Sequence, residues 1–111
     1  MKVKRTTREI ENLLPQIRIL LEKIYGVRLA DIILFGSFAR NRAGKDSDID
    51  IAVVLKGDVD TVKEISRISP ELYNLELKTG ELISVYPLSD EEIKNSVWPL
   101  YYHIKTEGIK I

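Results

Sequence analysis

Two short polar motifs, each beside an apolar run, hold the residue types in this chain that could do chemistry. The first is a glycine–serine turn at Gly36 and Ser37, and the second is a pair of alternating aspartates, Asp48 and Asp50. Both border β-branched runs that are typical of buried strands. Because an unpaired buried carboxylate is costly, such acids need a cation, a metal ion or a changed pKa. The spacing therefore favours a metal site over ordinary acids at a strand end.

The aspartate pair has the geometry of a carboxylate clamp. Side chains two positions apart in a strand share a face, and their α-carbons are about 6.5 Å apart. We therefore expect Asp48 and Asp50 to point to one side while Ile49 and Ile51 enter the core. Two such carboxylates can hold one divalent ion, or two ions about 4 Å apart. Since the chain lacks cysteine, hard oxygen ligands favour Mg²⁺, with Mn²⁺ as an alternative.

The glycine–serine turn is suited to bind an anion. Gly36 has no β-carbon, so its backbone can approach a ligand closely, and Ser37 is predicted to cap a short helix that ends near residue 41. Amides at the start of a helix bind phosphate. Arg40 and Lys45 on the following loop can neutralise further phosphate oxygens. An anion site beside metal-binding acids is what phosphoryl or nucleotidyl transfer requires.

The elements that must position these motifs alternate between helix and strand. Strands are predicted over residues 30–35, 48–55 and 82–86, with an edge strand at 109–111. Helices are predicted over residues 7–25, 59–78 and 99–107, with a further helix that begins at the capping box of residues 89–92. Prolines are predicted to kink the first helix or start it afresh at Pro15, to bend or break the second at Pro70, and to stop the third strand at Pro87. The fold class expected is α+β, a small mixed β-sheet with helices mainly on one face.

The apolar spacing within 59–78 predicts which residues of that helix face the sheet. These are Val62, Ile65, Leu72 and Leu75.

Length and charge bound the function classes. The 111 residues are expected to form one domain, residues 1–111, and the formal net charge is zero. A neutral chain gives no general electrostatic reason to bind nucleic acid or a membrane surface. No signal peptide is recognisable and no apolar stretch is long enough to span a bilayer, so a cytoplasmic protein is expected.

Residues 36–40 and 47–51 resemble the signature of the DNA polymerase β-like nucleotidyltransferase superfamily, and in size and layout the chain is most similar to its minimal nucleotidyltransferase (MNT) proteins. The resemblance is specific over residues 31–55 and covers only the order of elements elsewhere. It implies the polymerase β palm-like fold, Gly36 and Ser37 on a nucleoside triphosphate, and Asp48 and Asp50 on two Mg²⁺ ions.

The same resemblance implies a biological setting. Many MNT proteins are antitoxins encoded beside a helical HEPN-domain toxin, and some inactivate it by transferring AMP. The expected function is thus Mg²⁺-dependent transfer of a nucleoside monophosphate, with ATP favoured as donor, to a hydroxyl. Because the chain shows no extra domain to hold an acceptor, a protein partner is expected, and a homo-oligomer stays open.

Two positions depart from the family pattern. Asn41 stands where glycine is frequent, and asparagine enters the left-handed region more readily than most residues. The superfamily usually carries a third carboxylate on the next strand, where this chain has Ser84 at the centre and Glu81 at the start. The sequence therefore leaves two alternatives open: a catalytically silent antitoxin that covers its partner, and a regulatory nucleotide sensor.

Overall fold

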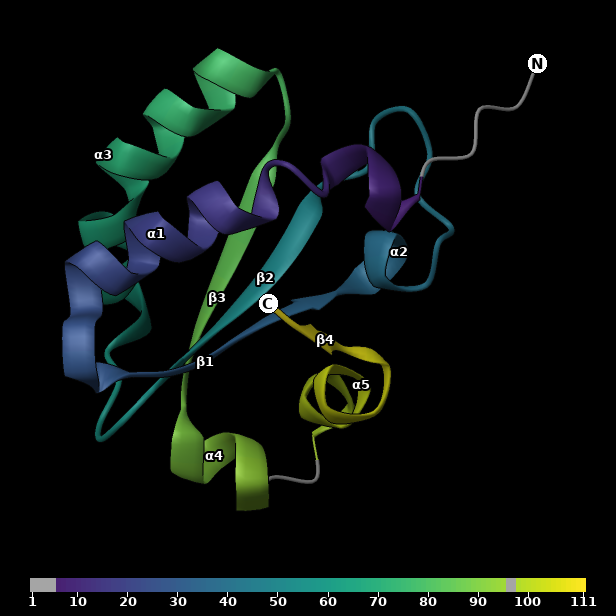
Figure 1. Cartoon of the computed structure of the whole chain (residues 1–111). Helices are drawn as coiled ribbons and strands as arrows, with labels where there is room; N and C mark the ends of the chain where they lie inside the picture. The colour runs from purple at the N-terminus through teal and green to yellow at the C-terminus, as the bar shows by residue number, and fades with distance from the viewer. Residues whose placement is uncertain (1–5, 96–97) are drawn as a thin grey trace.

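The computed structural model describes residues 6–95 and 98–111, which form a four-stranded sheet between helices (Figure 1). The strands are β1 (Leu29–Phe35), β2 (Ile49–Leu55), β3 (Ile83–Ser89) and β4 (Ile109–Lys110). The helices are α1 (Leu14–Tyr25), α2 (Gly36–Ala39), α3 (Thr61–Thr79), α4 (Asp90–Asn95) and α5 (Pro99–Glu107), and 3-10 turns span η1 (Thr7–Ile10) and η2 (Gly26–Arg28).

The sheet is mixed, as the sequence predicts. Its strand order is β3-β2-β1-β4, with β1 antiparallel to both β2 and β4 and β2 parallel to β3. The register places Asp50 of β2 opposite Phe35 on one side and Ser84 on the other. The start of β2, the end of β1 and the start of β3 therefore meet in one region.

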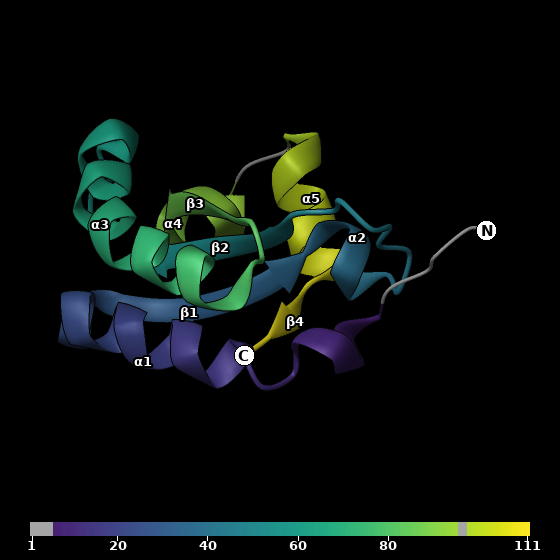
Figure 2. The ribbon, with the colours of Figure 1, turned by 90° about the horizontal axis from the view of Figure 1, so that it is seen from above.

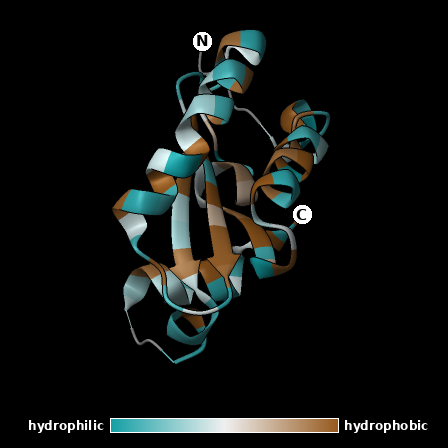
Figure 3. Cartoon of the chain, turned by 90° about the vertical axis from the view of Figure 1, so that its left-hand side faces the viewer, coloured by the Kyte–Doolittle hydropathy of each residue, from teal (hydrophilic) through white to brown (hydrophobic). Residues whose placement is uncertain are grey.

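Alternation along β2 divides the core between the two faces of the sheet. Ile49, Ile51 and Val53 are fully buried on the face that the long helices α1 and α3 cover. Ala52 and Val54 point to the other face, where Ile93 of α4 and Ile104 of α5 pack. Figure 2 shows the sheet between these helices, and Figure 3 shows that its strands are mostly hydrophobic. The longer helices thus share one face, and short helices cover part of the opposite face.

The start of the first helix agrees with the sequence prediction. A 3-10 turn is followed by α1, which begins at Leu14 with Pro15 in its first turn. Proline is tolerated there because the first amides of a helix have no intrahelical acceptor. None of the helices within the described part of the chain has the length and hydrophobicity needed to span a bilayer.

The prediction that Pro87 ends the third strand is wrong. β3 continues to Ser89, and Pro87 lies opposite Val53 of β2. β3 is an edge strand of the sheet. At a position of an edge strand whose backbone faces away from the neighbouring strand, no amide hydrogen is needed for the hydrogen bonds between the strands. The proline therefore removes no hydrogen bond between β2 and β3.

The predicted inward face of the second long helix is partly wrong. Leu72 and Leu75 are buried, but Val62 and Ile65 are 75% and 38% exposed. The buried side of α3 instead carries Glu64, which is 2% exposed, together with Ile68. The helix continues through Pro70 without a break.

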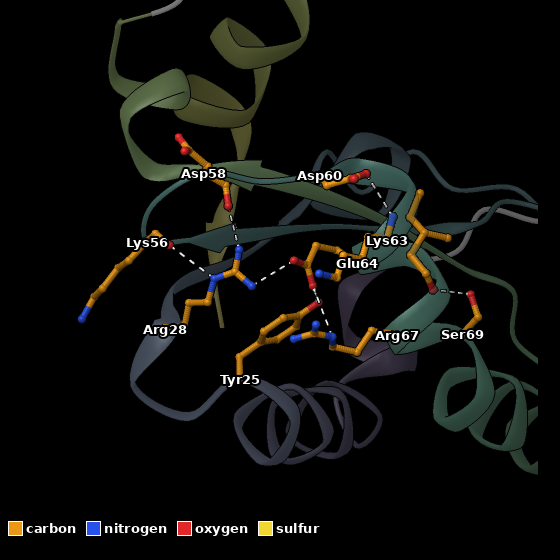
Figure 4. Close-up of polar contacts among 10 residues, drawn as sticks. Tyr25, Arg28, Lys56, Asp58, Asp60, Lys63, Glu64, Arg67 and Ser69 are labelled. Carbon is orange, nitrogen blue, oxygen red and sulfur yellow. Dashed lines mark hydrogen bonds and ion pairs between the residues drawn. The ribbon is translucent and has the colours of Figure 1, made fainter.

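Glu64 is buried because partners from distant segments satisfy its carboxylate (Figure 4). Arg28 Nη1 donates to Oε2 at 2.9 Å, and the Tyr25 hydroxyl donates to Oε1 at 3.1 Å. Arg67, one helical turn along, lies at 3.6 Å. These contacts join α3 to the end of α1 and to η2.

Candidate active site

The two aspartates lie at the start of β2 on one face of the sheet. Asp48 is exposed just before the strand, and Asp50 is half-buried as its second residue. Burial, and after it the charge of Asp48, raises the pKa of Asp50, as expected for two neighbouring carboxylates on one face of a strand. The structure therefore brings together the two acids that the sequence singled out; their role as metal ligands stays a prediction.

Gly36 lies directly against Asp50. Its φ is +74°, and a β-carbon at this position would overlap the Asp50 carboxylate oxygen and lie 3.2 Å from its Cγ. Glycine is thus required both by the left-handed backbone and by the neighbouring carboxylate. The close approach that the structure shows at Gly36 is to the aspartate motif, and its predicted contact with a ligand stays a prediction.

The expected capping role of Ser37 is wrong. The short helix α2 starts at Gly36, so the N-cap position is Phe35 and Ser37 lies inside the first turn. The backbone of Gly36 accepts from Arg40, and that of Ser37 accepts from Arg42 at 2.8 Å. The turn keeps the amides of its first residues directed out of the helix, as at any helix start.

Asn41 fixes the end of this turn in the way its residue type predicts. Its φ is +54°, in the left-handed region. Its side-chain oxygen accepts from Thr7 N at 3.1 Å and lies 3.3 Å from Thr7 Oγ1. Because Thr7 Oγ1 also donates to Phe38 O at 2.7 Å, the 3-10 turn η1 holds the turn that follows β1.

The two basic residues of the loop have different surroundings. Arg40 lies near Asp50, whose pKa its charge lowers, and its Nη1 is 3.5 Å from Glu107 Oε2 of α5. Lys45 is exposed, and no contact among the described residues joins it to the aspartates. Their roles as nucleotide ligands remain predictions.

Two hydroxyl side chains of β3 hydrogen-bond the aspartates from the strand on the other side of β2 from β1. Ser84 Oγ donates to Asp48 Oδ2 at 3.1 Å. The hydroxyl of Tyr86 hydrogen-bonds Asp50, and its ring packs edge-on against Phe35 with centroids 5.2 Å apart. Tyr86 was not among the predicted site residues, although its spacing of two from Ser84 puts both side chains on one face of a strand.

The third carboxylate is not supplied by the residues considered for it. Ser84 occupies the place beside the aspartates, and Glu81 precedes β3. Within residues 6–95 and 98–111, no three His, Cys, Asp or Glu side chains form a metal-binding group. The carboxylates of the site are therefore those of Asp48 and Asp50.

The electrostatics of the site favour a bound cation. Burial, followed by the charge of Asp48, raises the pKa of Asp50, and the hydrogen bond from Tyr86 and the charge of Arg40 offset only part of this. A divalent ion would remove that repulsion, and carboxylate and hydroxyl oxygens are the donors that hard cations prefer. The residues present thus fit a divalent metal ion.

Comparison with known proteins agrees with this geometry. The family model of the nucleotidyltransferase domain matches residues 14–110. A protein of Methanocaldococcus jannaschii named as a candidate protein adenylyltransferase is 36% identical over 89 residues, which cover 79% of this chain and 83% of that protein.

Two solved structures share the fold. One is a candidate minimal nucleotidyltransferase, with a TM-score of 0.61 and 22% identity over 92% of this chain and 95% of that one. The other is a mutant of the toxin–antitoxin pair MntA–HpeT, with a TM-score of 0.61 and 20% identity over 86% of this chain and 69% of that one. The resemblance in the motifs of residues 36–51 is confirmed: the chain belongs to the nucleotidyltransferase domain family and is a nucleotidyltransferase.

Proposed function

We propose that this chain transfers AMP from ATP to a hydroxyl group of a partner protein, with Mg²⁺ as the metal ion. The observation that carries the proposal is the meeting of the Gly36 turn with Asp50, beside Asp48. This arrangement sets the backbone of a helix start, which would bind an anion, directly against Asp50. A metal-bound triphosphate needs both.

Each residue of the site has a proposed task. Asp48 and Asp50 would hold one or two Mg²⁺ ions, which would neutralise the phosphates and polarise them for attack. The backbone of Gly36 and Ser37 would bind phosphate oxygens. Arg40, whose guanidinium pairs with Glu107, would offset negative charge close to Asp50. Lys45, an exposed residue of the same loop, would bind further phosphate oxygens.

A protein acceptor is supported by the relatives. The archaeal relative is named as a protein adenylyltransferase, and MntA is half of a toxin–antitoxin pair. The family resemblance adds a HEPN-domain protein as the partner. We therefore propose an MNT antitoxin that acts in the cytoplasm, where ATP is available.

A second candidate function rests on Ser84. A serine beside Asp48 is a weak ligand and a poor base where the superfamily carries an acid. A chain with only two carboxylates could bind its partner and silence it without turnover. This alternative predicts that the partner stays neutralised when Asp48 and Asp50 are both replaced.

The test uses labelled ATP, Mg²⁺ and the purified product of the neighbouring gene. Wild-type chain should label that protein, and the double variant Asp48→Asn, Asp50→Asn should not. Asp46→Asn is the matched control, because Asp46 is an exposed acid of the adjoining loop. Equal labelling by wild type and double variant would refute the enzyme, and protection of cells by the double variant would support the silent antitoxin.

A further inference from the structure

A groove runs along the free edge of β3, next to the site. It has a volume of about 400 Å³ between β3 and α3. The side of α3 contributes Ile65 and Tyr73, which are 38% and 60% exposed, and the strand contributes Ser84 and Tyr86. Ser84 and Tyr86 hydrogen-bond Asp48 and Asp50 on the opposite face of β3, so the groove and the aspartate site share the free edge of this strand.

The outer edge of β3 has a limited set of backbone groups that could hydrogen-bond an added strand. Leu82 O accepts from Ile49 N of β2. The backbone N–H and C=O groups of even-numbered residues in β3 therefore point toward β2, and those of odd-numbered residues point away from the sheet. The outward amide of Ile83 is taken by Glu76 Oε2 at 3.1 Å, and Pro87 has none. Between these two residues, Val85 is the position whose backbone can pair with an added strand.

The direction of the proposed reaction places the acceptor on this side. If the triphosphate lies against the Gly36 turn, it is on the β1 side of Asp50. In transfer of a nucleotidyl group, the attacking and leaving oxygens are roughly in line. The attacking hydroxyl then enters from the opposite side of the carboxylates, over Ser84 of β3.

We propose, building on the function above, that this groove is the acceptor-binding surface and that an extended segment of the partner protein adds to β3 as a further strand. The hydroxyl residue of that segment lies level with Ser84, on the aspartate face. The residues on either side of it point to the opposite face, toward Ile65 and Tyr73. The preferred acceptor is therefore a hydroxyl residue between two apolar ones.

The chemistry of the step is balanced without a further reactant. The acceptor oxygen forms a bond to the α-phosphorus of ATP, and the bond from that phosphorus to the bridging oxygen breaks. Pyrophosphate leaves, and the hydroxyl proton is released to solvent. The product is a phosphodiester that joins AMP to the acceptor side chain.

A partner segment suits this edge better than a second copy of the chain. If two β3 strands paired antiparallel around Val85, Ile83 of each would face Pro87 of the other. The amide of Ile83 is already bonded to Glu76, and Pro87 has no amide hydrogen. Such a pair would gain hydrogen bonds only around Val85, whereas a partner strand can present donors and acceptors without this conflict.

The binding test follows backbone amides of the isotope-labelled full chain by NMR, without nucleotide. The probe is the blocked peptide Lys-Thr-Val-Tyr-Val-Thr-Lys, and the comparison peptide has aspartate in place of both valines. We expect the first peptide to shift the Val85 amide and slow its exchange, and the second to bind at least about tenfold more weakly. Shifts elsewhere, or no shift at about 1 mM peptide, would overturn the proposal.

Three variants sharpen that test. Val85→Pro removes the outward donor without removing a bond to β2, and Tyr73→Asp places a charge in the groove. Each should weaken peptide binding about tenfold or more. Leu77→Asp is the matched control, since Leu77 is 66% exposed on α3 but does not line the groove. Unchanged binding by Val85→Pro and Tyr73→Asp, or β3 shifts that depend on chain concentration alone, would refute a partner strand.

Labelling of the natural partner separates this proposal from the one on which it rests. If Leu77→Asp labels the partner and Tyr73→Asp does not, the groove is supported. Equal labelling by both overturns the groove and leaves the transfer activity standing. If wild-type chain labels nothing, the proposed function fails and the peptide titration decides the groove by itself.

Discussion

The carboxylate of Asp50 occupies the space that a β-carbon of residue 36 would need. The two motifs, which are separated by fourteen positions in the sequence, therefore form one unit, in which the shape of the turn and the position of the acid depend on each other. Asp50 is half-buried against Gly36, and its pKa is raised by that burial and by Asp48. A cation bound beside Asp50 would offset both effects on its pKa.

The first prediction concerns Gly36→Ala. A β-carbon would displace the Asp50 carboxylate, and φ of +74° is unfavourable for alanine, so we expect a loss of about 1–3 kcal/mol in the free energy of unfolding. The free energy of Mn²⁺ binding, measured by calorimetry, should fall by more than the free energy of unfolding. Gly44→Ala is the control, because a β-carbon there would meet nothing closer than Ser47 Oγ at 3.9 Å. Wild-type Mn²⁺ binding by Gly36→Ala would contradict the role of this contact.

The second prediction separates the metal-free from the metal-bound protein. In Asp50→Asn, the buried charge that Asp48 repels is removed, so the melting temperature without metal should rise. Addition of Mn²⁺ should stabilise wild-type chain and leave the variant unchanged. AMP transfer, where wild type shows it, should fall about thousandfold or more, since lost metal binding costs several kcal/mol of transition-state stabilisation. A fall in metal-free stability would show that Asp50 is not under electrostatic strain.

Local patterns made the aspartate site predictable. Apolar runs bounded by turn residues identified β1 and β2, and the alternation of Asp48 with Ile49 assigned the acids to one face. The preference of asparagine for the left-handed region anticipated the backbone of Asn41. In each case the physical cause lies within a few residues along the chain.

Features that depend on strand pairing or distant partners were not predictable in the same way. Tyr86 reaches Asp50 because β3 pairs parallel to β2. Pro87 is tolerated because β3 is an edge strand. Glu64 displaces Ile65 from the buried side of α3 because Arg28, 36 residues earlier, neutralises it. Local propensity contains no information on any of these contacts.

The third prediction tests whether the site lacks only one acid. In Ser84→Asp, the new carboxylate would lie beside that of Asp48, where Ser84 Oγ now donates at 3.1 Å. A third hard ligand should raise Mn²⁺ affinity about tenfold, and a third negative charge should lower metal-free stability. Ser84→Asn introduces a side chain of the same size as aspartate but without charge, so it should neither raise the Mn²⁺ affinity nor lower the metal-free stability in this way. Unchanged Mn²⁺ affinity in Ser84→Asp would place Ser84 outside the ligand shell.

The fourth prediction concerns acid stability and the polar cluster around Glu64 (Figure 4). Burial by itself would raise the pKa of Glu64, but hydrogen bonds from Arg28 and Tyr25 and the charges of Arg28 and Arg67 outweigh it, so the pKa lies below the ordinary value of 4.5. A carboxyl group with a lowered pKa in the folded state stabilises that state above its unfolded pKa. This contribution is lost as the pH falls through the folded pKa.

Chemical unfolding between neutral pH and about pH 3 measures that loss. Wild-type chain should lose stability through this range, and Glu64→Gln should lose less of it while being less stable at neutral pH. Glu22→Gln should follow wild type, because the Arg18–Glu22 pair is exposed at the surface. Arg28→Met, which leaves the buried carboxylate without its closest cation, should cost about 3 kcal/mol at neutral pH. If Glu64→Gln and wild type lost stability in parallel as the acid is added, the cluster would not control acid unfolding, and exposed carboxylates would have to do so.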